Sequence, residues 1–409
     1  MAAKAVRERR GCRSGRPGQA FDWPRGEDPS GWRGTAECYP KPTPHPGGSE
    51  DTRRFARSLR GGFFYGFRIV LIEFLSYSPA YFCKMLLEKF KNFSQKGLDR
   101  GSGKSPERKE TVIMNKPTVF TGAATAIITP LTPDGIDFDR YGAMIDWQIE
   151  AGIDAIVTVG TTGEGSTLSD EEHRAAIKYC VEKVAGRVPV IAGTGYNDTA
   201  YSVDLSRYAA DVGADAMLLV TPYYNKATQK GMIACSVAVA EAIDKPCILY
   251  NVPGRTGCNM LPKTVAEMAE HPNIVAIKEA SGNMSQIAEI ASLVEGKMDI
   301  YSGNDDQIIP VLSLGGKGVI SVLSNILPAE TSLMCKKFFA GDVAGARRMQ
   351  LDYLELINAL FCEVNPLPVK AACAAMGLCE NHVRLPLTPM EEDHRQNLLR
   401  LMRKAGLTV

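Results

Sequence analysis

The sequence predicts an α/β protein whose parallel strands close into a (β/α)8 TIM barrel. Two observations lead to this prediction. Short apolar runs recur eight times from residue 118 onward, and stretches with helical signals lie between them. The runs are nearly continuous in Val, Ile, Leu and Ala, as expected for parallel strands that are covered on both faces. Eight such strand–helix units, joined by right-handed crossovers, close into a barrel.

The expected strands cover residues 125–130, 155–160, 188–194, 216–222, 247–253, 274–280, 298–303 and 318–324. Between the second and third strands, Ser169 is predicted to cap a helix, because Glu172 follows three positions later. Residues 139–150 and 264–270 show similar helical patterns. An open doubly wound sheet is the alternative fold, but residues 128–133 lack the glycine fingerprint that this fold carries after its first strand.

The chain is expected to have three parts. Residues 1–113 form an extension, residues 114–327 contain the barrel strands and helices, and residues 328–409 contain the last barrel helix and a small C-terminal helical appendage. The helical patterns of this last part cover residues 329–339, 344–361, 368–376 and 391–404.

The extension differs in composition from the rest of the chain. Residues 1–60 carry eleven Arg and two Lys against seven acidic residues, with Pro/Gly clusters and no hydrophobic periodicity. Such a stretch is expected to be disordered, or to lie outside the native enzyme if translation begins at Met114, which we favour. A plastid transit peptide is the alternative, but transit peptides are Ser-rich and poor in acids, whereas these residues hold only four Ser.

The composition limits the classes of partner. A formal net charge of +1 gives no basic excess for nucleic acid or for an anionic membrane. The eleven Cys are scattered without a Cys-x-x-Cys pair, which indicates reduced thiols and a cytoplasmic location. The five His form no His-x-x-x-His pair, so no metal is predicted, and no cofactor is predicted either.

Reactive side chains of such a barrel lie where the strands end, at the carboxyl face. Lys278 lies inside the apolar sixth strand. A lysine in this environment either pairs with a carboxylate, such as that of Glu279, or supplies an amine that attacks a ketone. Tyr250, at the end of the fifth strand, is a candidate proton shuttle, and Arg255 offers a planar fork for a carboxylate. A Gly-rich loop with two adjacent Thr, residues 160–165, offers donors for a second carboxylate.

Five motifs carry a family resemblance. They are Gly-Thr-Thr-Gly-Glu at 160–164, Thr-Pro-Tyr-Tyr-Asn at 221–225, Tyr-Asn-Val-Pro-Gly-Arg-Thr-Gly at 250–257, Ile-Lys-Glu-Ala-Ser-Gly at 277–282 and Gly-Val-Ile-Ser-Val at 318–322. Over residues 117–407 the chain resembles the 4-hydroxy-tetrahydrodipicolinate synthases, which belong with the pyruvate-dependent class I aldolases. The resemblance implies condensation of pyruvate with aspartate 4-semialdehyde in lysine and diaminopimelate biosynthesis, by a homotetramer built from two dimers.

The resemblance also implies the roles of individual residues. Lys278 would form the Schiff base with pyruvate, and Tyr250 would act as its general acid/base. Thr161 would relay protons between Tyr250 and Tyr224, which a neighbouring subunit would supply. The substrate-binding residues would be Thr162 for the pyruvate carboxylate, Arg255 for the carboxylate of the aldehyde, and Gly303 and Ile320 for the pocket wall.

Regulation by lysine is expected to be weak. His173, Asn197 and Tyr223 match the effector site of lysine-sensitive members of the family, but Asp170 and Tyr201 stand where a histidine and a glutamate often occur. Losing that glutamate removes a partner for the lysine α-ammonium.

Two other functions remain open at this point. The first is another pyruvate-dependent aldolase, such as N-acetylneuraminate lyase or a keto-deoxy-sugar aldolase, although such relatives generally lack an arginine matching Arg255. The second is a non-catalytic paralogue that binds keto acids, which the presence of the whole proton relay disfavours.

Overall fold

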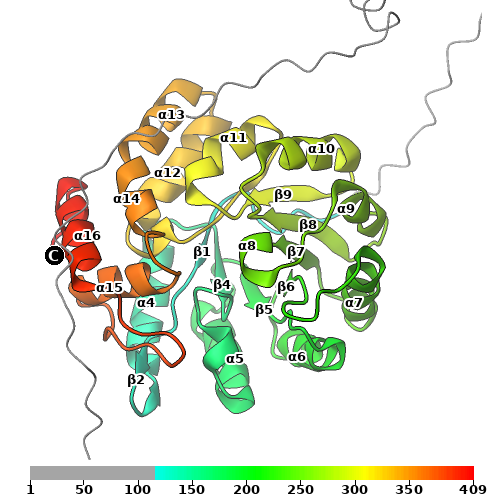
Figure 1. The fold of residues 1–409 in the computed structure, drawn as a ribbon, viewed down its shortest axis with the longest axis horizontal. Coiled ribbons are helices and arrows are strands. Elements are labelled where there is room, and N and C mark those ends of the chain that lie inside the picture. The colour runs from blue at the N-terminus through cyan, green and yellow to red at the C-terminus, as the bar shows by residue number, and fades with distance from the viewer. Residues whose placement is uncertain (1–115) are drawn as a thin grey trace, which may run out of the picture. The chain divides into compact units, whose positions relative to one another are not determined.

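A computed structural model describes residues 116–409, and the predicted extension, residues 1–113, lies outside the described residues. Eight parallel strands form a closed barrel in the order β1-β10-β9-β8-β7-β6-β5-β4 (Figure 1). The barrel strands are β1 (Gly122–Ala126), β4 (Ala155–Thr158), β5 (Val190–Gly193), β6 (Ala216–Val220), β7 (Cys247–Asn251), β8 (Ile274–Glu279), β9 (Asp299–Ser302) and β10 (Gly318–Ser321). The predicted TIM barrel is therefore confirmed.

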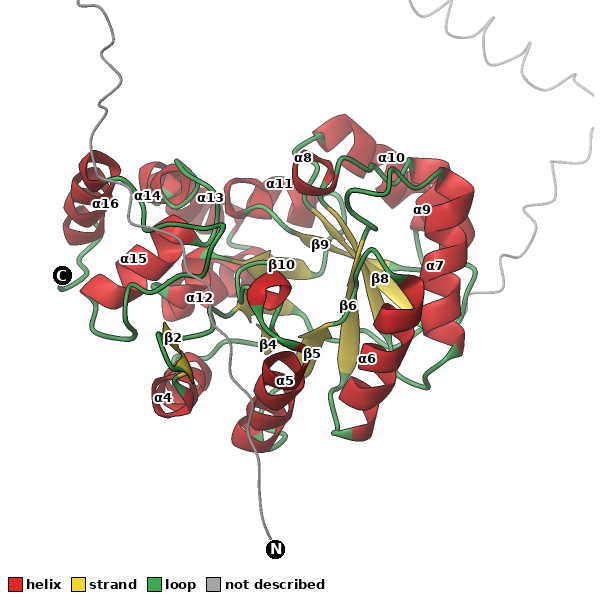
Figure 2. Cartoon of the chain, turned by 60° about the horizontal axis from the view of Figure 1, so that its bottom comes forward, coloured by secondary structure: helices red, strands yellow, loops and turns green. Residues whose placement is uncertain are grey.

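Helices surround the strands, as Figures 1 and 2 show. They are α4 (Phe138–Glu150), α5 (Asp170–Val184), α6 (Thr199–Asp211), α7 (Gln229–Glu241), α8 (Pro253–Thr256), α9 (Pro262–Met268), α10 (Met284–Val294), α11 (Ile308–Ser313), α12 (Pro328–Phe339), α13 (Val343–Asp352), α14 (Leu354–Ala359), α15 (Leu367–Ala375) and α16 (Glu392–Lys404). Three short 3-10 helices, η1 (Gly165–Thr167), η2 (Asp305–Gln307) and η3 (Leu323–Asn325), and the hairpin of β2 (Leu131–Thr132) and β3 (Gly135–Ile136) lie in the connections. None of the helices in residues 116–409 is long and apolar enough to cross a membrane.

Two hydrophobic cores follow from the alternation of side chains along the strands. Alternate strand residues, such as Val157, Ile248 and Ile320, form a core of their own inside the barrel. The other strand residues pack against the helices in a larger, outer core. The interior core is filled at the amino end of the barrel, where the ring of Tyr301 stacks on Phe120 with 4.2 Å between centroids. The carboxyl end is therefore the side at which interior side chains remain open to reaction.

Two predicted elements differ from the structure. The first strand covers Gly122–Ala126, whereas the sequence predicted residues 125–130. A side chain at Gly318 would meet the carbonyl oxygen of Gly122 at 1.9 Å, so this part of the barrel requires small residues, which an apolar pattern does not reveal. The larger Ile127 and Ile128 are fully buried beyond the end of the strand. The predicted helix over residues 344–361 is two helices, α13 and α14, separated at Tyr353.

The predicted cap of α5 is confirmed. The Ser169 hydroxyl accepts a hydrogen bond from the Glu172 amide, and the Glu172 carboxylate accepts one from the Ser169 amide. This reciprocal arrangement satisfies two amides that would otherwise lack partners at the start of the helix. It fixes where α5 begins, directly after the loop that follows β4.

Candidate active site

Lys278 and Tyr250 face one another inside the barrel. They are register partners on the adjacent strands β8 and β7. The side-chain nitrogen of Lys278 lies 4.4 Å from the centroid of the Tyr250 ring. Both residues are buried, with exposed fractions of 5% and 6%. An amine and a phenol, the two groups that imine chemistry requires, are therefore neighbours near the carboxyl end of the barrel.

Gly303 lies next to the lysine, and Ile320 belongs to the same interior core as Tyr250. A side chain at Gly303 would lie 3.1 Å from Cε of Lys278 and 2.6 Å from Cβ of Ala280. A larger residue at this position would clash with Ala280 and press on the lysine side chain. Ile320, on β10, is fully buried in the interior core of the barrel.

The loop after β4, residues 160–165, carries the two adjacent threonines. Thr161 lines a cavity at the carboxyl end of the barrel. The Thr162 hydroxyl is buried and accepts a hydrogen bond of 3.0 Å from the side-chain amide of Asn365. Glu164 has a left-handed backbone with φ of 55°, and its carboxylate forms an ion pair with Lys370 on α15. The loop is thus held from the C-terminal region.

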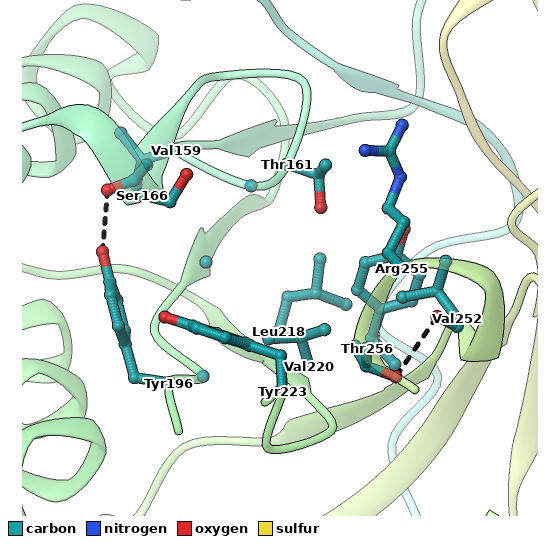
Figure 3. A pocket seen from close by; sticks show the side chains of 15 residues that line it. Val159, Thr161, Ser166, Tyr196, Leu218, Val220, Tyr223, Val252, Arg255 and Thr256 are labelled. Carbon is teal, nitrogen blue, oxygen red and sulfur yellow. Dashed lines mark hydrogen bonds between the residues drawn. The ribbon is translucent and has the colours of Figure 1, made fainter. Parts of the chain in front are cut away.

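The cavity has a volume of about 300 Å³. Its lining includes Thr161, Tyr196, Tyr223, Tyr250 and Arg255. In the view of Figure 3, Tyr196 and Arg255 lie at opposite sides, with Thr161 and Tyr223 between them. Lys278 does not itself line this cavity, but the ring that its nitrogen faces, that of Tyr250, does. The lysine nitrogen is therefore adjacent to a residue of the cavity wall.

Arg255 lies on α8, immediately after β7. Its side chain lines the cavity, and Nη2 donates a hydrogen bond of 3.1 Å to the main-chain carbonyl of Asn365. The other guanidinium nitrogens make no hydrogen bond or ion pair with residues 116–409. Arg255 is therefore placed to bind an anion at the edge of the cavity.

Tyr224 is not brought to the cavity of its own chain. Its side chain is 88% exposed, and its backbone is left-handed with φ of 69°. The neighbouring Tyr223 turns inward and lines the cavity instead. The structure of one chain therefore gathers Lys278, Tyr250 and Thr161, and leaves Tyr224 pointing into solvent.

Of the residues that match an effector site, Tyr223 lines the cavity, and His173 contacts Tyr196, which also lines it. His173 is buried, with Nε2 3.0 Å from the carbonyl oxygen of Gly193 and Nδ1 3.1 Å from the hydroxyl of Tyr196. Burial lowers the pKa of His173 and raises that of Tyr223. Asn197 contributes its main-chain carbonyl, which accepts a hydrogen bond of 2.8 Å from Asn225.

Asp170 accepts a hydrogen bond at each of its carboxylate oxygens. Its Oδ1 accepts a hydrogen bond of 2.9 Å from the Tyr201 hydroxyl, and its Oδ2 accepts one of 2.8 Å from Nε of Arg174. These contacts, above all the one with Arg174, lower the pKa of Asp170.

Sequence reasoning missed two residues of the site. Tyr196 follows β5, so the rule that reactive groups lie at the carboxyl ends of strands could have identified it. Its hydroxyl donates a hydrogen bond of 2.7 Å to the carbonyl of Gly165, in the loop after β4. Asn365 follows no strand, and nothing in the local sequence signals that it contacts both Thr162 and Arg255.

Comparisons with known proteins agree with this geometry. Residues 119–405 match the dihydrodipicolinate synthetase family. The 4-hydroxy-tetrahydrodipicolinate synthase of Acetivibrio thermocellus is 55% identical over 294 residues, which cover 72% of this chain and 100% of that protein.

Two solved structures show the same fold. One is the chloride-inhibited dihydrodipicolinate synthase of Acinetobacter baumannii in complex with pyruvate, with a TM-score of 0.70 and 45% identity over 71% of this chain and 100% of that one. The other is the DHDPS of Cyanidioschyzon merolae with lysine bound, with a TM-score of 0.69 and 40% identity over the same shares. The chain therefore belongs to the dihydrodipicolinate synthetase family.

Proposed function

We propose that this chain condenses pyruvate, held as a Schiff base on Lys278, with aspartate 4-semialdehyde, in the lysine and diaminopimelate pathway. The observation that carries the proposal is the position of the Lys278 nitrogen over the Tyr250 ring, 4.4 Å from its centroid, inside the barrel. The name and the high identity of relatives such as the Acetivibrio protein support the same reaction.

The proposed chemistry needs an amine and a way to move protons, and no cofactor. Lys278 Nζ attacks the pyruvate carbonyl carbon to give a carbinolamine, which loses water to form an iminium ion. Loss of a methyl proton gives an enamine, whose carbon attacks the aldehyde. Tyr250 gives and takes the protons at the imine. Thr161 connects it to Tyr224, so that protons reach solvent.

Each substrate carries a carboxylate, and we propose that a different residue binds each of the two. The Thr162 hydroxyl binds that of pyruvate, close to the barrel interior. Arg255 binds that of the aldehyde at the edge of the cavity. A short acidic aldehyde uses this guanidinium, whereas a long polyhydroxylated sugar gains nothing from it. The sugar-aldolase alternative is therefore not favoured.

Tyr224 connects the chemistry to assembly. Because its aromatic side chain is 88% exposed in the loop after β6, we propose that it enters the site of a neighbouring subunit in a homotetramer.

A cytoplasmic location is proposed on the basis of the thiols. The eight cysteines of residues 116–409 are all free, which is typical of a reducing compartment.

The proposed function is tested by supplying pyruvate with aspartate 4-semialdehyde, and separately with N-acetylmannosamine, and following product. Activity confined to the sugar would contradict the proposal. Borohydride reduction in the presence of pyruvate should add the mass of the reduced adduct to the peptide that contains Lys278. An unmodified peptide would instead favour a non-catalytic protein.

A further inference from the structure

We propose that Asn365 is a positioning residue of the keto-acid site, because its side chain sets the direction of the Thr162 hydroxyl proton. The inference rests on the proposed function, which assigns Thr162 to the pyruvate carboxylate. Asn365 lies between α14 and α15 and is separated from Thr162 by 203 positions. It therefore belongs to the C-terminal region, although it acts on a loop of the barrel.

The contacts of Asn365 point to both substrate sites. Its Nδ2 donates a hydrogen bond of 3.0 Å to Oγ1 of Thr162, and its main-chain carbonyl accepts one of 3.1 Å from Nη2 of Arg255. Asn365 is buried, with an exposed fraction of 6%. One residue thus contacts both groups that the proposed function assigns to carboxylates.

The hydrogen-bonding capacity of a hydroxyl explains what the side chain does. A threonine hydroxyl has one proton to donate and two lone pairs that accept. Because Asn365 fills a lone pair of Thr162, the hydroxyl proton has to point away from the amide. It remains available for a carboxylate oxygen, with which it forms a charge-assisted hydrogen bond. Without the amide, the hydroxyl would rotate freely and lose this bias.

The side chain of Asn365 has no other structural task in residues 116–409. The bond to Thr162 is the single hydrogen bond that its amide makes there, and its Oδ1 is buried without a partner. A buried amide with an unsatisfied oxygen is unfavourable for stability. The orientation of the amide therefore favours its hydrogen bond to Thr162, although this leaves its own oxygen without a partner.

The position of Asn365 is held by a second tie between the same two segments. Lys370, on α15, forms its ion pair with Glu164, two residues beyond Thr162 in the same loop, and both side chains are fully or almost fully buried. This ion pair keeps the start of α15 against the loop. The distance between the Asn365 amide and the Thr162 hydroxyl is thereby kept constant.

The test is a double-mutant cycle in the full chain. Its readout is the pyruvate concentration at which borohydride trapping on the Lys278 peptide is half-maximal. Asn365→Ala should raise this concentration about tenfold, as expected for one weakened hydrogen bond to a charged group. In the Thr162→Val background, Asn365→Ala should raise it no further, because the residue acts through Thr162. The KM for aspartate 4-semialdehyde should change less than twofold, since the carbonyl that contacts Arg255 is retained.

Asn365→Asp keeps the shape of the side chain and so guards against a variant that fails to fold. A carboxylate only accepts hydrogen bonds, so it would draw the Thr162 proton toward itself and repel pyruvate. Half-maximal trapping should therefore need more pyruvate than in Asn365→Ala. Asn273→Ala is the matched control, because its amide also donates hydrogen bonds, of 3.0 and 2.9 Å, to the carbonyls of Ala240 and Ile243, away from the cavity.

Unchanged trapping in Asn365→Ala or Asn365→Asp would overturn the inference, as would an equal rise in the Thr162→Val background or in Asn273→Ala. A wild-type chain that traps pyruvate but does not use the aldehyde would contradict the proposed second substrate, while the trapping series still decides the role of Asn365. A wild-type chain that traps no pyruvate would overturn both proposals.

Discussion

Glu164 and Lys370 form an ion pair in which the two side chains are 1% and 0% exposed. The carboxylate belongs to the loop after β4 and the ammonium to α15, 206 positions later. The pair ties the threonine loop of the site to the C-terminal helices. Desolvation lowers the pKa of Lys370, while the negative charge of Glu164 opposes this shift. Each charge therefore depends on the other for its stability in the interior.

Removing one partner of this pair should be strongly destabilising. Lys370→Met leaves a buried carboxylate without its cation, which costs about 3–5 kcal/mol of the free energy of unfolding. The double variant Glu164→Gln/Lys370→Met should recover most of that loss, because no buried charge remains. Urea denaturation measures both. The exposed pair of Lys404 and Glu355 is the control, and Lys404→Met should cost less than about 1 kcal/mol. A double variant as unstable as Lys370→Met would contradict this account.

The ion pair of Glu172 with Arg384 should make stability depend on pH in the acid range. Two hydrogen bonds of 2.5 Å from the guanidinium are the main reason why the pKa of Glu172 is lowered from 4.5. A carboxyl whose pKa is lower in the folded state stabilises the fold above the unfolded pKa, and this contribution is lost as the pH falls through the folded pKa. Arg384→Met should therefore be less stable than the wild type by about 1 kcal/mol at pH 7.

The difference between the two proteins should begin to shrink as the pH falls below 4.5, and its charge-dependent part should be gone once the pH has passed the lowered pKa of Glu172 in the folded wild type. Urea denaturation at a series of pH values, from pH 7 down to the lowest pH at which the protein folds, measures this difference in the free energy of unfolding. Arg348→Met removes the exposed pair with Asp352 and should show little difference at any pH. A constant difference between wild type and Arg384→Met at all pH values would mean that lost packing, rather than the charge of Glu172, is responsible.

Replacing the proposed nucleophile should abolish turnover without unfolding the barrel. Lys278→Ala removes the amine that forms the imine, so activity should fall by at least about three orders of magnitude. The circular dichroism spectrum should be retained, because the substitution also removes a buried cation. Steady-state rates and borohydride trapping measure the effect. Lys317→Ala serves as the control, because this lysine lies directly before β10 and its main-chain groups bond to Ile300 and Gly122. If Lys278→Ala still trapped pyruvate, another lysine would have to form the Schiff base.

Arg255→Ala should mainly weaken use of the aldehyde. The guanidinium lines the cavity and has one hydrogen bond to the carbonyl of Asn365. Its loss should raise the KM for aspartate 4-semialdehyde about 10- to 100-fold, the range of a charge-assisted hydrogen bond to a carboxylate. Half-maximal trapping of pyruvate should change much less. If pyruvate trapping fell as far as aldehyde use, the role proposed for Arg255 would be wrong.

Lysine should inhibit the enzyme weakly or not at all. Tyr201 stands where the resemblance implies a glutamate in lysine-sensitive members, so the site lacks that carboxylate as a partner for the α-ammonium of lysine. Initial rates with about 1 mM lysine, which half-fills a site whose Kd is about 1 mM, should fall by no more than about half. A steep fall in rate at micromolar lysine would contradict this prediction. Tyr201→Glu, which supplies a carboxylate at that position, should increase sensitivity.

Local and periodic features were accessible from the sequence. The capping of α5 involves only Ser169 and Glu172, three residues apart, so the chain carries the whole signal in one place. The barrel strands repeat an apolar pattern, which the requirement for burial on both faces explains. Lys278 and Tyr250 stood at strand ends, and the geometry of a parallel barrel brings all strand ends to one rim.

The tertiary structure alone decided how the C-terminal region enters the site. Asn365 and Lys370 contact a loop more than 200 positions earlier in the chain, and no local pattern encodes a contact over that separation. The same is true of Tyr223 and Tyr224, identical in type and adjacent in sequence. Tyr223 lines the cavity, whereas Tyr224, with its left-handed backbone, is exposed. Residue type thus determined which chemistry was available, whereas packing between distant segments determined which side chains meet.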